Sequence, residues 1–191
     1  MRGQIKAVLS GLSKATVIVT HDQLEALTMA DRIAIMRDGL IEQVGTPHEV
    51  FARPANVFVA SFIGTPQMNL IEADLKRYSG GKATLGFDRQ DLELTVNPAV
   101  AGLQPGGVTL GVRPRAFTVV PGGTGGAIEA LAELIEPMGA ETLIHARTRA
   151  GGDIRVVVPR EKKVATGEAL HLVPDPAQTH VFGGDGRAVR Q

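Results

Sequence analysis

The sequence contains no cysteine and no tryptophan, and aromatic residues fill only 4% of its 191 positions. Without cysteine, neither a disulfide framework nor a thiolate metal site can form, which fits a reducing compartment. No apolar run approaches the roughly 18 residues that predict a membrane-spanning helix. Residues 1–14 also lack the apolar core of a signal peptide. Any association with a membrane is therefore expected to pass through a partner protein.

The chain also lacks an excess of charge of either sign, because 20 basic residues balance 20 acidic ones. Proteins that bind nucleic acid usually carry a basic excess, so the balance predicts no nucleic-acid partner. Phe87, Phe117 and Phe182 are interpreted as core residues rather than as platforms on which bases stack. The remaining composition, 43% hydrophobic and 21% charged, is that of an ordinary globular protein of one or two domains.

Helix and strand patterns alternate over the first 64 residues. Apolar positions at helical spacing, β-branched runs, capping residues and an Asp-Gly turn define the boundaries. The expected elements are a helix over 2–13, a buried strand over 15–20, a helix from His21 to about Ala30, strands over 32–36 and 40–44, a helix that starts at Thr46 and stops before Pro54, and a helix over 57–63 that Gly64 ends.

The pattern changes near residues 64–68, where we place a domain boundary. Short runs that alternate apolar and polar residues follow, separated by clusters of glycine, and this spacing predicts a small barrel or sandwich. The expected strands cover 70–76, 82–87, 92–96, 108–112, 142–148, 154–158 and 169–173. Residues 128–136 fit a strand or a helix, because glutamate, alanine and leucine also favour helices.

One run of residues carries a chemical signal. The segment THDQLEA at 20–26 puts His21 between the predicted buried strand and a helix that Asp22 can cap. In α/β folds, ligand-contacting groups occupy such junctions. A surface histidine beside a helix cap is the simpler interpretation of this segment alone. The segment continues, however, in ADRI at 30–33, in MRDGLIEQVGTP at 36–47, and in four shorter runs at 49–50, 54–56, 58–64 and 68–69.

Together these runs resemble the switch-histidine region of ABC ATPases, in the importers of the maltose and glycerol-phosphate type that carry an extra C-terminal regulatory domain. The second half resembles the regulatory domain itself, a TOBE domain with an oligonucleotide/oligosaccharide-binding (OB) fold. Its markers are LGVRP at 110–114 and EPMGAET at 136–142. Arg115 stands where the family has glutamate, so this sequence departs from the family pattern there.

The resemblance implies a fold and a function. It implies that residues 1–64 are an α/β remnant of an ABC ATPase domain and that residues 65–191 are an all-β, OB-fold-like barrel. His21 would contact the γ-phosphate of ATP and help to orient the attacking water, which makes it both the catalytic and the cofactor-binding residue. The intact parent would use ATP and Mg²⁺ to drive sugar or sugar-phosphate import. It would associate with transmembrane permease subunits on the cytoplasmic face of the membrane.

The sequence contains no phosphate-binding loop of the form Gly-x-x-x-x-Gly-Lys-Ser/Thr, which would hold the nucleotide through backbone N–H groups and a lysine. The nearest match, Gly81-Lys82, continues with alanine and has no glycine at the required upstream position. We therefore expect the chain to be the C-terminal part of such a subunit and, on its own, to bind ATP weakly without hydrolysing it. We also expect self-association, through the regulatory domain and through apolar surface on the ATPase part.

Two alternatives stay open. The chain could be a stand-alone module for dimerisation or regulation without nucleotide chemistry, which an ATP titration would distinguish. It could also bind a small anion, for which Arg113 and Arg115 are the candidates, although Arg113 is better interpreted as structural. The histidines have no metal-ligand spacing. We interpret the acidic residues Glu133, Glu136 and Glu141 as a solvated strand face.

Overall fold

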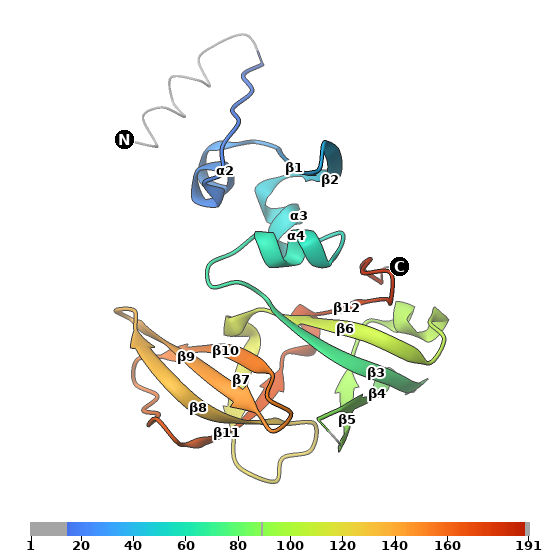
Figure 1. Ribbon diagram of the computed structural model, residues 1–191, viewed down its shortest axis with the longest axis vertical. Coiled ribbons are helices and arrows are strands. Elements are labelled where there is room, and N and C mark those ends of the chain that lie inside the picture. Colours follow the sequence, from blue (N-terminus) through green and yellow to red (C-terminus); the bar gives the residue numbers. More distant parts are fainter. Residues whose placement is uncertain (1–14, 89, 190–191) are drawn as a thin grey trace.

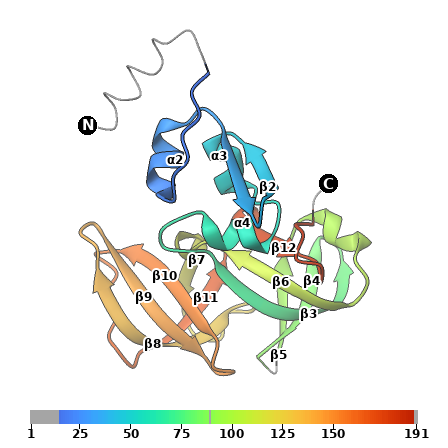
Figure 2. The same cartoon turned by 45° about the horizontal axis from the view of Figure 1, so that its top comes forward.

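The computed structural model describes residues 15–88 and 90–189. A small part with helices and one hairpin comes first, and two five-stranded sheets follow (Figure 1). Helix α4 lies between the hairpin and the sheets in both views (Figure 2). We call residues 15–64 the helical part and residues 69–182 the β part. No helix in the described ranges is long and apolar enough to span a membrane.

Short local signals define the elements of the helical part. Asp38 and Gly39 adopt positive φ angles of 51° and 80°, which is the conformation that a tight hairpin turn requires. Asn56 caps its helix by accepting a hydrogen bond from the Val59 N–H. The elements are α2 (Gln23–Met29), β1 (Ile33–Arg37), β2 (Leu40–Gly45), α3 (Pro47–Ala52) and α4 (Val57–Phe62).

The start of α3 is a complete capping box. The Thr46 hydroxyl accepts a hydrogen bond from the Glu49 N–H at 3.2 Å, and the Glu49 carboxylate accepts one from the Thr46 N–H at 2.8 Å. Pro47 occupies the first helical position, where its missing N–H costs nothing. The hydrogen bond from the Thr46 backbone holds the pKa of Glu49 below its ordinary value. The prediction of this helix start is confirmed.

The prediction of a buried strand over 15–20 is wrong. These residues form no strand in the structure, and Val17 and Val19 are 88% and 95% exposed. A β-branched run becomes a buried strand only where neighbouring strands pair with it, and no described strand does so here. The helix expected over 2–13 lies outside the described residues.

The β part consists of two sheets whose neighbouring strands all run antiparallel. In the first, the strand order is β12-β6-β3-β4-β5, and in the second it is β10-β9-β8-β11-β7. The first sheet is built from β3 (Asn69–Ser79), β4 (Lys82–Phe87), β5 (Gln90–Thr95), β6 (Gly106–Val112) and β12 (Thr179–Phe182). The second is built from β7 (Phe117–Val120), β8 (Ile128–Pro137), β9 (Glu141–Thr148), β10 (Asp153–Pro159) and β11 (Ala169–Pro174).

All seven strands predicted after residue 64 are present, and the ambiguous segment at 128–136 is strand β8. Strands β7 and β12 were not predicted. Each has only four residues, which is too short for an alternating pattern to stand out. Strand β12 pairs with β6, about seventy positions earlier in the chain, so the end of the β part returns to its first sheet.

One continuous cluster of buried apolar side chains fills the β part, and both sheets contribute to it. The side chain of Asn69, only 4% exposed, also joins the sheets through polar contacts. Its Nδ2 donates to the carbonyl oxygens of Val112 at 3.1 Å and Arg155 at 2.8 Å, and its Oδ1 accepts from the Arg155 N–H at 2.7 Å. Asn69 on β3 thus bonds the main chain of β10, an edge strand of the other sheet.

The helical part has its own small core. Ile33 and Ile35 of β1 pack with Val50, Val59 and Ile63 from the two helices that follow. The inward face of α2 packs against this cluster through partly buried side chains. A third cluster joins the helical part to the β part and consists of Ala60, Met68 and Phe182, with Val57, Leu70 and Ala188 beside them.

Candidate functional site

His21 lies on the exposed loop between residues 15–20 and helix α2. The residues on either side of it are fixed by local hydrogen bonds. The Asp22 N–H donates to the Thr20 hydroxyl at 2.9 Å, and that hydroxyl donates to the Glu25 carboxylate at 2.9 Å. The Asp22 carboxylate caps α2 by accepting from the N–H groups of Leu24 and Glu25. The predicted cap is therefore confirmed, and the imidazole of His21 is presented to solvent from an ordered turn.

Gln23, the first residue of α2, connects this turn to a distant segment. Its Oε1 accepts a hydrogen bond from the N–H of Gly64 at 2.7 Å, across 41 residues of sequence. Gly64 follows α4 and has a φ of 114°, which side-chain-bearing residues rarely adopt. This bond holds the start of α2, and the turn at His21 that precedes it, against the end of α4.

Arg113 reaches the same place from the β part. It follows β6, is only 7% exposed, and donates to two main-chain carbonyls of the helical part. Its Nη2 bonds the Phe51 oxygen at 2.8 Å, and its Nη1 bonds the Ile63 oxygen. The guanidinium carbon lies 4.0 Å from the centre of the Phe51 ring, a cation–π contact. A Cβ on Gly64 would lie 2.5 Å from Arg113 Nη1 and would displace the guanidinium, and the φ of 114° also favours glycine at that position.

The charge of Arg113 is stabilised by these carbonyls and not by a carboxylate. Burial lowers its pKa to about 10, so the side chain stays a cation at neutral pH. Its Nε is buried and has no hydrogen-bond partner among the described residues. Both guanidinium NH₂ groups point at protein oxygens, which supports the structural interpretation of Arg113 and leaves no open anion site at this residue.

The C-terminal segment holds the other end of α4. The Gly186 oxygen accepts from the Val57 N–H at 2.9 Å, and the Ala55 oxygen accepts from the Ala188 N–H at 2.9 Å. An isolated bridge between Asn56 and Arg187 lies between these two bonds. Helix α4 is therefore held at both ends. Residues 186–188, which fold back onto β12, bond the start of the helix, and Arg113 bonds the Ile63 carbonyl at its end.

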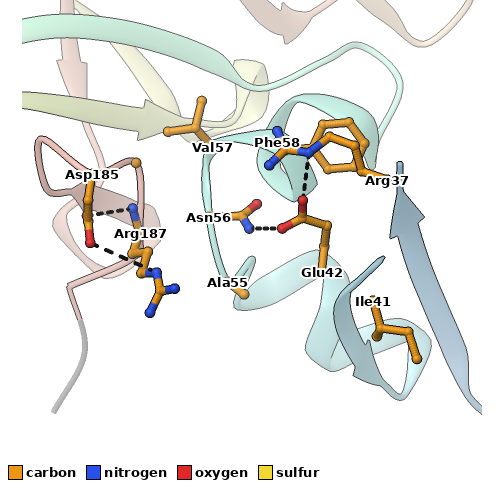
Figure 3. Close-up of a pocket in the computed structure, with 10 residues that line it drawn as sticks. Arg37, Ile41, Glu42, Ala55, Asn56, Val57, Phe58, Asp185 and Arg187 are labelled. Atoms are coloured by element: carbon orange, nitrogen blue, oxygen red, sulfur yellow. Dashed lines mark hydrogen bonds and ion pairs between the residues drawn. The ribbon is translucent and has the colours of Figure 1, made fainter. Parts of the chain in front are cut away.

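A polar pocket of about 630 Å³ opens beside that attachment (Figure 3). Its charged groups already pair with one another. Glu42 accepts from Arg37 at 2.7 Å and from the Asn56 amide at 2.6 Å, and the Arg37 guanidinium lies over the Phe58 ring. The pocket lies between hairpin, helix and C-terminal segment. Because these side chains bond one another, the pocket is best described as an interface that connects the three elements, and its lining does not indicate a particular ligand.

The exposed face of strands β8 and β9 carries a row of acidic side chains that each bond a partner. Glu133 and Arg147 bond through two contacts of 2.7 and 3.1 Å, and Glu136 lies 2.7 Å from the Nε2 of His145. The Nε and Nη2 of Arg115 donate to the two carboxylate oxygens of Glu141, at 2.8 and 2.6 Å. The sequence did not predict that each acidic residue has a basic partner. The partners become neighbours only through strand pairing and the loop after β6.

Hydrogen bonds from Arg115 hold the pKa of Glu141 below its ordinary value. Arg115→Ala should therefore raise the pKa of Glu141. Arg115→Glu, which restores the residue usual in the family, should raise it further because two carboxylates would then adjoin. Carbon-13 NMR titration of the glutamate side chains measures this. An unchanged Glu141 titration in both variants would contradict the pairing.

Because the folded-state pKa of Glu141 is depressed, its pairing stabilises the fold above the ordinary glutamate pKa. That contribution is lost as the pH falls through the depressed value. Both partners are solvent-exposed, so the contribution is small.

The residues of the sequence motifs gather at the junction of the two parts. Gly111 and Arg113 line its β side, and Gly64 and Gln23 line its helical side. At Gly111 a Cβ would lie 2.7 Å from atoms of both Met68 and Phe182, so close packing excludes a side chain there. Sequence reasoning assigned no role to Gln23 or Asn69, although both stand inside the quoted runs. No group of three or more potential metal ligands occurs in the described part of the chain.

Three comparisons with known proteins bear on this arrangement. Residues 110–182 match the family model of the TOBE domain, a span that begins within β6 and ends with β12. The chain is 40% identical over 185 residues to the sn-glycerol-3-phosphate import ATP-binding protein UgpC of Jannaschia sp. (strain CCS1), covering 97% of this chain and 49% of the relative. It is 36% identical over 198 residues to the diacetylchitobiose uptake system ATP-binding protein MsiK of Streptomyces coelicolor (strain ATCC BAA-471 / A3(2) / M145), covering 95% of this chain and 51% of the relative.

The chain thus spans about half the length of the curated relatives it matches. Among solved structures, the cytoplasmic molybdate-binding protein ModG aligns with a TM-score of 0.49 and 14% identity, over 59% of this chain and 94% of ModG. That likeness is too weak to say anything of ligands.

Proposed function

We propose that this chain supplies the switch histidine and the regulatory domain of an ABC-type import ATP-binding subunit. Nearly all of the chain aligns with about half of the length of two ATP-binding proteins of uptake systems. The observation that carries the proposal is the continuous match over 97% of the chain at 40% identity. The activity we propose for the whole protein is ATP-driven uptake of a sugar or a sugar phosphate. The ATPase remnant is residues 1–64, and the OB-fold-like barrel is residues 65–191.

We propose His21 as the residue that contacts the γ-phosphate. Its ring is exposed, while the turn that carries it is fixed by the Asp22 cap and the Thr20 hydroxyl. A side chain held in this way can donate a hydrogen bond to charge that develops during phosphoryl transfer. ATP and Mg²⁺ are the cofactors of the proposed whole protein. Its partners are transmembrane permease subunits at the cytoplasmic face of the membrane.

The 191-residue chain should bind Mg-ATP weakly or not at all. The phosphate-binding loop provides most of the contacts to a nucleotide's charge, and the sequence has none. Isothermal titration with Mg-ATP measures this. Binding in the low micromolar range would overturn the expectation, and it would also argue against a module without nucleotide chemistry.

The chain should also self-associate. Apolar side chains are exposed on the helical part, where Val17, Val19 and Leu40 are 88%, 95% and 72% exposed, and Leu131 and Leu134 are half exposed on β8. Apolar surface of this kind favours association between copies. Light scattering at several concentrations should give a mass of at least two chains. A monomer at every concentration would count against self-association, and charged substitutions at Leu131 and Leu134 would test whether the regulatory domain carries the contact.

A further inference from the structure

We propose that Gln23 and Arg113 are positioning residues for His21, acting through the single peptide group that joins Ile63 to Gly64. Arg113 donates to the carbonyl of this peptide group, and Gln23 accepts from its N–H. The peptide therefore links the β part to the turn that carries the histidine. The inference rests on the proposed function of His21 for its consequence in catalysis, but the linkage itself does not depend on that function.

The geometry of a peptide group makes it an effective link. Its carbonyl and N–H lie in one rigid plane, so tilting one of them moves the other. A cation bonded to the carbonyl oxygen also polarises the group and strengthens its N–H as a donor. Ile63 and Gly64 are both buried, so water competes poorly for either bond. The two hydrogen bonds, one from each part of the molecule, therefore reinforce one another.

The β side of the link is firmly held. Arg113 is fixed by three contacts, to the carbonyls of Phe51 and Ile63 and to the Phe51 ring. Its main chain follows β6, the strand that pairs with both β3 and β12. A displacement of the β part relative to α4 must therefore move the guanidinium and, with it, the plane of the 63–64 peptide.

The helical side of the link leads to His21 in two residues. Gln23 is the first residue of α2, and the carboxylate of Asp22 caps the same turn. The Asp22 N–H is in turn bonded to Thr20, so the backbone on both sides of His21 is tied to the start of this helix. Loss of the Gln23–Gly64 bond should release the turn and widen the range of directions that the imidazole adopts. Through this path, the arrangement of the β part would set the alignment of the histidine.

Substitutions in the full 191-residue chain test the link without nucleotide. Gln23→Ala removes the oxygen that accepts from Gly64, and Gln23→Glu keeps an accepting oxygen. Arg113→Lys keeps the positive charge but loses the two guanidinium NH₂ groups that bond separate carbonyls. Gln43→Ala is the matched control, because Gln43 also bonds main-chain groups of the helical part but does not touch the 63–64 peptide. The readouts are amide hydrogen exchange at Gly64 and α2, and the imidazole NMR signals of His21, assigned by their loss in His21→Ala.

We expect Gln23→Ala and Arg113→Lys to speed exchange at Gly64 and in α2 by about tenfold, the effect of losing roughly one hydrogen bond. Both should shift the His21 ring signals, while Gln43→Ala leaves them in place. Gln23→Glu adds a charge near His21, so its readout is exchange at Gly64, which should stay slow because an acceptor is kept. Slow amide hydrogen exchange in β8 and β9 shows that the β part remains folded in each variant. Unchanged His21 signals in Gln23→Ala would overturn the proposal, even if Arg113→Lys proves too unstable to measure.

The test separates this proposal from the proposed function. If the link is present but His21 has no part in ATP hydrolysis, exchange and ring signals still respond to Gln23→Ala. If His21 is catalytic but the link is absent, the signals stay unchanged and only turnover depends on the histidine.

Discussion

His21→Ala should lower ATP turnover by about 10²–10³, the usual cost of removing one hydrogen-bond donor to transition-state charge. The measurement requires a protein with a phosphate-binding loop, made by joining this chain in frame behind the corresponding half of a related import subunit. ATP affinity should change little, because that loop carries ground-state binding. Steady-state phosphate release, compared with nucleotide titration of the same protein, separates the two effects.

His48→Ala is the matched control for that experiment. His48 is also exposed, on the first turn of α3, and belongs to no contact described at the junction. Its replacement should leave turnover nearly unchanged. Equal turnover in the His21→Ala protein and the unsubstituted fusion would show that this histidine has a different role.

Arg113→Ala should destabilise the chain by about 1–3 kcal/mol for the buried carbonyl that loses its donor, with a further cost for the packing that is lost. The substitution leaves the buried carbonyl of Ile63 without its donor and exposes the face of the Phe51 ring. It also opens a cavity between α4 and the β part. Urea denaturation followed by far-ultraviolet circular dichroism measures the free energy of unfolding.

Arg115→Ala provides the comparison two positions along the chain. Arg115 is exposed and bonds a carboxylate at the surface, so its removal should have little effect on stability. If Arg113→Ala and Arg115→Ala unfold at the same urea concentration, the buried arginine does not stabilise the junction.

Features set by a few adjacent residues could be predicted from the sequence. The Asp38-Gly39 turn and the box formed by Thr46 and Glu49 depend on groups within four positions of each other, and both are confirmed. The strands of the β part were predictable because their alternating pattern reflects one buried face. Residues 15–20 show the limit of such reasoning. A run with the composition of a buried strand needs partners, and the composition does not supply them.

The contacts that give the candidate site its form depend on distant residues. Sequence reasoning found the Asp22 cap from its spacing and the role of His21 through the resemblance, but not that Gln23 bonds Gly64 across 41 positions. It interpreted Arg113 as structural without identifying the carbonyls that hold it. It also placed Glu136 on a solvated face and missed His145, which the antiparallel register brings beside it. A single sequence carries no signal for these pairs, because nothing local requires either partner.

The side chain of Asn69 also bears on how the molecule avoids polymerising. An edge strand such as β10 presents unpaired N–H and carbonyl groups that invite a strand from another molecule. A primary amide has the same donor and acceptor as a peptide bond, and Asn69 turns both toward Arg155 in the middle of β10. It therefore imitates one residue of a neighbouring strand and occupies the main-chain groups of Arg155 that a strand from another molecule would otherwise pair with.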